Sequence, residues 1–183
     1  MLIGGCNSRS IQYPVGLLDF VRWLGDTPWS IALHESDYAY AIVESVHVLT
    51  LCLFLGFAIM LDLRLAGLTM REEPVSKVSA RLLPPIVAAF VIMVISGVLL
   101  FYAIPVRTYE NVFFRIKVVL LLLAGLNAFV FHSTIWKRLA DWDNDTRPPL
   151  RARVAGMLSL IFWAGIVIAG RMIAYNWFDK DPT

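Results

Sequence analysis

Ionisable residues inside apolar stretches are the part of this sequence whose types and spacing could do chemistry. Glu44 and His47 are three residues apart in the first apolar stretch, so a helix would place them on one face. Three cations lie near the ends of two further apolar stretches, at the same expected depth: Arg115, Lys117 and Arg171. Ionisable groups at the edge of a hydrocarbon layer are costly, so each is by default a candidate for function.

A neutral histidine surrounded by cations at that depth suits haem b. The iron needs an axial imidazole, here from His47, and cations at the interface can bind the two propionates. Glu44 would orient or counter-charge these cations by pairing with Lys117 or Arg171. Two alternatives stay open. One is a quinone head group that accepts hydrogen bonds from histidine and lysine, and the other is a structural histidine beside a structural salt bridge.

A second histidine would serve a second site. His132 lies fifteen residues after Lys117 in the sequence, which is about 22 Å along a straight helix. His47 and His132 therefore cannot ligate the same haem, and iron at both would mean one haem in each leaflet. A five-coordinate haem on His47 is equally open. The candidates for a second axial ligand are His34, Met157 and Met172.

Long apolar blocks must position these residues. The chain of 183 residues is 58% hydrophobic and 16% charged, whereas soluble domains average about 25% charged residues. Blocks of about 20 residues are long enough to cross a ~30 Å hydrocarbon layer as helices. Four such blocks are present: 42–66, 83–104, 116–136 and 154–177. We predict an all-α fold, an integral membrane four-helix bundle formed by residues 37–178.

Segments outside the spans complete the predicted organisation. Residues 1–36 are expected to form a polar tail followed by an N-terminal interfacial helix, and residues 179–183 a solvated tail. Pro28 suits the first turn of a short second element with Thr27 as its cap, and Pro84-Pro85 suit the opening of the second span.

Polar residues within the spans have structural interpretations too. Asp62 and Arg64 at the inner end of the first span are expected to pair with each other or with the following loop, as at a solvated helix end. Asn127 in the third span is expected to hydrogen-bond a neighbouring helix.

Basic residues predict the orientation of the bundle. Nine of the sixteen Lys and Arg residues flank the two loops that join the spans in pairs: Arg64, Arg71, Lys77, Arg81, Lys137, Arg138, Arg147, Arg151 and Arg153. The positive-inside rule places those loops in the cytoplasm and both termini outside. No basic run suits nucleic acid. The expected partners are the lipid bilayer and a membrane or periplasmic redox protein, and an oligomer remains open.

Three runs of sequence resemble a bacterial family of four-span inner-membrane proteins of unknown function. They are ESVHVLTLCLFLG at 44–56, FRIKVVLLLLAGLNA at 114–128 and AGRMIAY at 169–175. The resemblance implies a multi-pass protein of the bacterial inner membrane, which with the predicted orientation makes both termini periplasmic.

A more distant similarity concerns the membrane-type protoporphyrinogen oxidase HemJ and the copper-resistance protein CopD. His47 matches their first-span histidine, Arg64 an arginine near the inner end of that span, and Lys117 a lysine that opens the third span, while His132 roughly matches a late histidine. The similarity implies a haem-associated or redox-active bundle.

Together these features predict a membrane redox protein that binds one or two haem b groups. It would transfer electrons between a quinone or a haem-pathway substrate and a periplasmic partner, which leaves open whether it is itself an oxidoreductase or the membrane subunit of one. The alternative is a non-catalytic small subunit that packs against a larger membrane complex and binds pigment, quinone or lipid.

Overall fold

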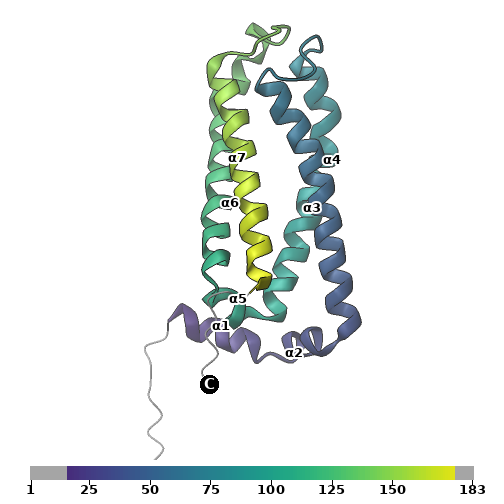
Figure 1. Ribbon diagram of the computed structural model, residues 1–183, viewed down its shortest axis with the longest axis vertical. Coiled ribbons are helices and arrows are strands. Elements are labelled where there is room, and N and C mark those ends of the chain that lie inside the picture. Colours follow the sequence, from purple (N-terminus) through teal and green to yellow (C-terminus); the bar gives the residue numbers. More distant parts are fainter. Residues whose placement is uncertain (1–15, 176–183) are drawn as a thin grey trace, which may run out of the picture.

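The computed structural model describes residues 16–175, and within that range it contains helices and no strand (Figure 1). Four helices are long and apolar enough to cross a membrane, so the prediction of an all-α membrane bundle is confirmed. The predicted terminal tails and the predicted end of the fourth span at residue 177 lie outside the described residues.

The four long helices pack as two hairpins. They are α3 (Asp37–Leu65), α4 (Val75–Ala103), α6 (Val112–Val130) and α7 (Leu150–Met172). Helix α6 continues as a π-helical turn, Phe131–Ile135, and a 3-10 turn, Trp136–Asp141. Helix α3 packs on α4, α6 packs on α7, and the contact between α3 and α7 joins the two hairpins (Figure 1).

Three short helices lie across the end of the bundle that we call the α5 end, which is the predicted outer side (Figure 1). They are α1 (Leu17–Gly25), α2 (Pro28–Glu35) and α5 (Pro105–Glu110). Helix α1 buries Val21 and exposes Leu17, Phe20 and Trp23, as suits an interfacial helix. Pro28 occupies the first turn of α2, as predicted.

Tyr102, at the end of α4, holds α2 against the bundle. The hydroxyl of Ser30 donates to the Tyr102 carbonyl at 2.7 Å, and Ser30 is buried. The hydroxyls of Thr27 and Tyr102 hydrogen-bond each other at 2.6 Å. Thr27 is the N-cap residue of α2, but its hydroxyl donates to the Leu24 carbonyl and makes no capping bond with α2. These bonds fix α2 on the corner between α4 and α5.

The opposite end, which we call the loop end, is closed by one buried arginine. Arg64 is 0% exposed and donates from Nε and Nη2 to the Glu73 carbonyl at 3.0 and 2.8 Å, and from Nη2 to the Asp145 carbonyl at 3.3 Å. Asp62 is also buried and interacts with Ser159 of α7. The prediction of a solvated helix end is therefore wrong, whereas the predicted pairing of Arg64 with the following loop is confirmed.

The start of α4 is set by a residue from the other hairpin. Asp143 accepts hydrogen bonds from the backbone N–H of Ser76 at 2.7 Å and from its hydroxyl at 2.6 Å, which caps the helix. Because of this cap α4 begins at Val75, and Pro84 and Pro85 lie inside it. The prediction that the two prolines open the helix is wrong, since the polar first turns of α4 lie outside the apolar block.

Close approach between the hairpins depends on Gly156. A Cβ atom at this position of α7 would lie 2.7 Å from the Asp62 carbonyl oxygen and 3.2 Å from the Leu65 Cβ atom of α3. Within the second hairpin, the Asn127 side chain donates to the Ala155 carbonyl at 2.9 Å, which confirms its predicted interhelical bond. These contacts fix α3, α6 and α7 relative to one another between the middle of the bundle and the loop end.

Candidate functional site

His47 projects from α3 against α4, where its ring is held by two hydrogen bonds. Its Nδ1 atom lies 3.0 Å from the Met93 carbonyl oxygen and 3.0 Å from the Ser96 hydroxyl. A carbonyl can only accept, so this contact requires the proton on Nδ1. The Ser96 hydroxyl in turn donates to the Ile92 carbonyl at 2.8 Å. The Nε2 atom then keeps its lone pair, and it has no hydrogen-bond partner in residues 16–175.

A glycine makes room for the His47 ring. A Cβ atom on Gly97 of α4 would lie 3.1 Å from Cε1 of His47 and 3.5 Å from its Nδ1 atom. Any larger residue at this position would press on the imidazole. The orientation of the ring is therefore set jointly by the polar atoms and by a missing side chain of α4.

Lys117 is the cation that acts electrostatically on His47. It lies on α6, is half-buried, and forms no ion pair or hydrogen bond within residues 16–175. Its ammonium group lies beside Gly170 of α7, where a Cβ atom would be 3.5 Å from Nζ. Lys117 and Glu44 both act electrostatically on His47, and Glu44 is exposed. An unpaired cation at this depth is available to an anionic or hydrogen-bond-accepting ligand.

The predicted ion pairs of Glu44 are not formed. The described part of the chain contains one ion pair, in which Nζ of Lys77 lies 2.6 Å from a carboxylate oxygen of Glu73 on the surface of the loop end. There the hydrogen bond from Lys77 holds the pKa of Glu73 below its usual range. Glu44 instead interacts electrostatically with Tyr40, one turn earlier on α3, and with His47.

Arg115 and Arg171 are exposed, and their described contacts are with tyrosines. Arg115 donates to the Tyr109 carbonyl at 3.2 Å and lies 5.3 Å from the centre of that ring. Arg171 lies 5.6 Å from the centre of the Tyr175 ring. Of the three predicted propionate-binding cations, the structure therefore brings only Lys117 into the electrostatic neighbourhood of His47.

His132 lies in the π-helical turn near the loop end, with its side chain exposed on the bundle surface. Its ring stacks on Trp136, with centres 5.6 Å apart and an angle of 19° between planes, and Nδ1 is 3.3 Å from the Ala128 carbonyl. The structure thus does not join His132 to the His47 site. Residues 16–175 contain no group of three His, Cys, Asp or Glu side chains that could hold a metal ion by themselves.

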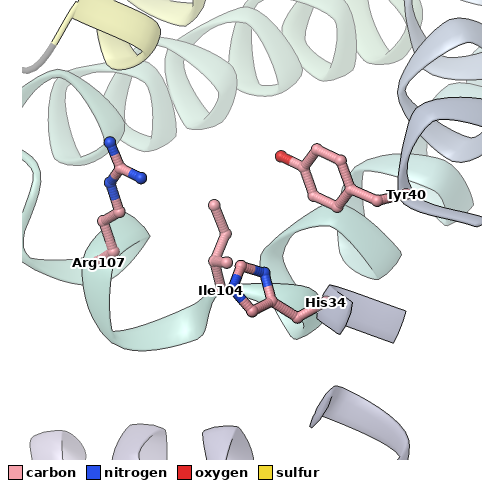
Figure 2. Close-up of a pocket in the computed structure, with 4 residues that line it drawn as sticks. All are labelled: His34, Tyr40, Ile104 and Arg107. Carbon is pink, nitrogen blue, oxygen red and sulfur yellow. The ribbon is translucent and has the colours of Figure 1, made fainter. Parts of the chain in front are cut away.

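A cavity of about 260 Å³ opens near the site at the α5 end (Figure 2). It is lined by His34 of α2, Tyr40 of α3, Ile104 at the corner after α4 and Arg107 of α5. From the sequence, His34 is predicted only as a candidate second axial ligand of the iron, and no role is predicted for Tyr40 or Arg107. Two features of the sequence could have indicated these residues: Tyr40 lies one helical turn before Glu44, and Arg107 lies in the short segment between two spans.

Comparison with known proteins gives one family. Residues 31–176 match a family whose description is "Family of unknown function (DUF6644)". No curated protein and no solved structure matches the chain. The similarity to HemJ and CopD therefore has no support beyond the individual residues that suggested it.

Proposed function

The chain belongs to the DUF6644 family, a family of unknown function, and we propose that it is a membrane redox protein that binds haem b through His47. In this proposal it passes electrons between a quinone or a haem-pathway substrate in the bilayer and a periplasmic partner. The bilayer is the bacterial inner membrane, with the α5 end and both termini on the periplasmic side. The support comes from the surroundings of two residues, His47 and Lys117.

The observation that carries the proposal is the anchoring of His47 by α4. Histidines that ligate metals usually donate their other ring N–H to a carbonyl, which fixes the tautomer, orients the ring and raises its basicity. Here Nδ1 is bonded to the Met93 carbonyl and the Ser96 hydroxyl, so the free Nε2 atom is the one available to iron. Haem b would supply the one-electron chemistry, since its iron cycles between two oxidation states.

Lys117 supplies the second element of the site. A half-buried ammonium group without a protein anion can bind a propionate through a charge-assisted hydrogen bond. The Lys117 side chain lies against Gly170, where a Cβ atom would be 3.5 Å from Nζ and 3.8 Å from Cε. Arg115 and Arg171 would join it only by leaving the rings of Tyr109 and Tyr175.

The test is an absorption spectrum of the purified protein, oxidised and then reduced with dithionite, after expression with added haem precursor. We expect sharp reduced haem bands in the wild type and their loss in His47→Ala. His132→Ala is the matched control, because His132 lies on the surface near the loop end, and we expect it to retain the bands. A colourless wild type, or an unchanged spectrum in His47→Ala, would overturn the proposal. Loss of half of the haem in His132→Ala would instead establish the second, inner site.

A second candidate function is a non-catalytic small subunit that packs against a larger membrane complex and binds pigment, quinone or lipid. It is favoured by α4, which carries no charge between residues 86 and 103 and exposes a broad apolar face that includes Val87, Ile95 and Val98. The Nε2 atom of His47 and the ammonium group of Lys117 would then face a quinone head group. A colourless protein that co-purifies with a larger complex in native detergent extracts would favour this function over the first.

A further inference from the structure

The cavity at the α5 end is lined by three polar side chains from three separate helices: His34, Tyr40 and Arg107. Among the side chains that the structure describes, none of the three has a hydrogen-bond or ion-pair partner, although Arg107 acts electrostatically on Tyr40. Figure 2 shows the Tyr40 hydroxyl pointing toward the side of the space on which Arg107 stands. A guanidinium, a phenol and an imidazole can all donate hydrogen bonds, so the lining is suited to an anion.

The walls of this cavity are fixed before any ligand binds. The Ser30 and Thr27 bonds to Tyr102 hold α2, which carries His34, against the end of α4. The Thr108 hydroxyl donates to the Ile104 carbonyl at 2.8 Å and so holds the corner at which α5, with Arg107, leaves α4. A site whose donors are already in position loses less entropy on binding.

The size of the cavity selects a small group. Pockets that enclose drug-sized ligands measure about 300–1,000 Å³, whereas this cavity has about 260 Å³. It is too small for a haem macrocycle, and its Tyr40 side lies about 10 Å along α3 from His47. The cavity is therefore separate from the proposed haem site.

The location and the charge together indicate which anion. The lining residues lie at the ends of spans, with Tyr40 near the start of α3 and Ile104 directly after α4. Helices α2 and α5, which carry His34 and Arg107, cross this end of the bundle (Figure 1). Arg107 adds a positive charge there, and Glu44, which acts electrostatically on Tyr40, does not line the cavity. Arginine forms paired hydrogen bonds with phosphate oxygens.

We propose that Arg107, Tyr40 and His34 form a binding site for a phosphate group at the membrane interface. The phosphate can be that of a lipid headgroup or a free phosphate from solution, and both present the same oxygens to the guanidinium. Arg107 binds two of these oxygens, Tyr40 donates its hydroxyl, and His34 closes the α2 side. This site is independent of haem binding, so either can fail without the other.

The test measures thermal stabilisation of the full-length protein in a neutral detergent. The first arm adds phosphatidylglycerol, with diacylglycerol of the same acyl chains as the lipid without phosphate, and the second arm adds inorganic phosphate alone. We expect saturable stabilisation of the wild type by a phosphate-bearing ligand and none by diacylglycerol. Saturation by phosphatidylglycerol only would identify the lipid source, and saturation by inorganic phosphate would identify the soluble source.

Variants decide whether the effect belongs to this cavity. We expect Arg107→Gln to weaken the apparent affinity about tenfold or more, since it removes a charge-assisted pair of hydrogen bonds, and Tyr40→Phe to weaken it less. Arg107 is exposed and bonds to no described residue, so Arg107→Gln should fold. Arg151→Gln is the control, because Arg151 is also exposed but lies at the loop end and does not line the cavity. Equal stabilisation of the wild type and Arg107→Gln, or equal effects of phosphatidylglycerol and diacylglycerol with none from inorganic phosphate, would overturn the proposal.

Discussion

Gly156 offers a direct test of how the two hairpins are joined. In Gly156→Ala the new Cβ atom would meet the Asp62 carbonyl oxygen at 2.7 Å, together with the Leu65 Cβ atom and the Ala66 backbone nitrogen at 3.2 and 3.3 Å. All three are backbone or Cβ atoms at the end of α3, which cannot turn aside as a flexible side-chain end could. Restoring a C···O contact of ~3.3 Å requires α3 and α7 to separate by about 0.6 Å.

The size of the effect follows from a matched substitution. Alanine is favoured over glycine in a helix interior by about 0.5–1 kcal/mol, which stabilises any Gly→Ala variant. Gly125 lies in α6, and a Cβ atom added there would meet nothing within 4 Å, so Gly125→Ala gains this term alone. The helical term cancels in the difference between the two variants. The difference is then the cost of overpacking, about 1–3 kcal/mol.

The free energy of unfolding can be compared by titrating each variant with sodium dodecyl sulfate in mixed micelles and following helix content by circular dichroism. We expect Gly156→Ala to unfold at lower denaturant than Gly125→Ala. The same variant should disturb the His47 site, because α3 carries His47 and α7 packs on the helix that carries Lys117. Equal stability of the two variants would refute the close approach of α3 and α7.

Two further predictions concern the loop end. Arg64→Met should lower the free energy of unfolding by about 2–4 kcal/mol, because it removes buried charged hydrogen bonds, and it should speed proteolysis in loops 66–74 and 142–149. Substitution of the exposed Arg71 by Met should do neither. Loops that stay resistant to proteolysis in Arg64→Met would contradict the role of this arginine. Because the hydrogen bond from Lys77 lowers the pKa of Glu73 in the folded protein, the pair stabilises the fold above the unfolded pKa of about 4.3 and this contribution is lost as the pH falls through the lowered value. An NMR titration of the Glu73 carboxyl, compared with Lys77→Met, should show the lowered pKa only in the wild type, and an identical pKa in both would argue against the pair.

The sequence alone was enough for the membrane architecture. Length and hydropathy are local properties, so four apolar blocks of about 20 residues predict four spans whatever their neighbours are. The same holds for Pro28 in the first turn of α2, because a proline requires no partner there. Asn127 could also be predicted to bond a neighbouring helix, since an amide in the middle of a span has no water to bind.

Tertiary structure alone decided which polar groups meet. A helix that is apolar on all faces carries no stripe that shows which face packs inward, so its rotation about its own axis cannot be read from the sequence. The rotation of α3 places the His47 ring against the Met93 carbonyl. The predicted ion pair of Glu44 with Lys117 or Arg171 is not formed, and both Glu44 and Arg171 are exposed.

Contacts between distant segments decided the rest. The start of α4 depends on Asp143, which is 67 residues from Ser76 in sequence, and the burial of Arg64 depends on carbonyls of two separate loops. The cavity at the α5 end likewise exists only because α2, α3 and α5 meet there. The amino-acid sequence determined that this chain forms four membrane spans, because hydropathy acts residue by residue. The folded structure determined which of its charges are buried, paired or free, because those outcomes depend on the partners that packing supplies.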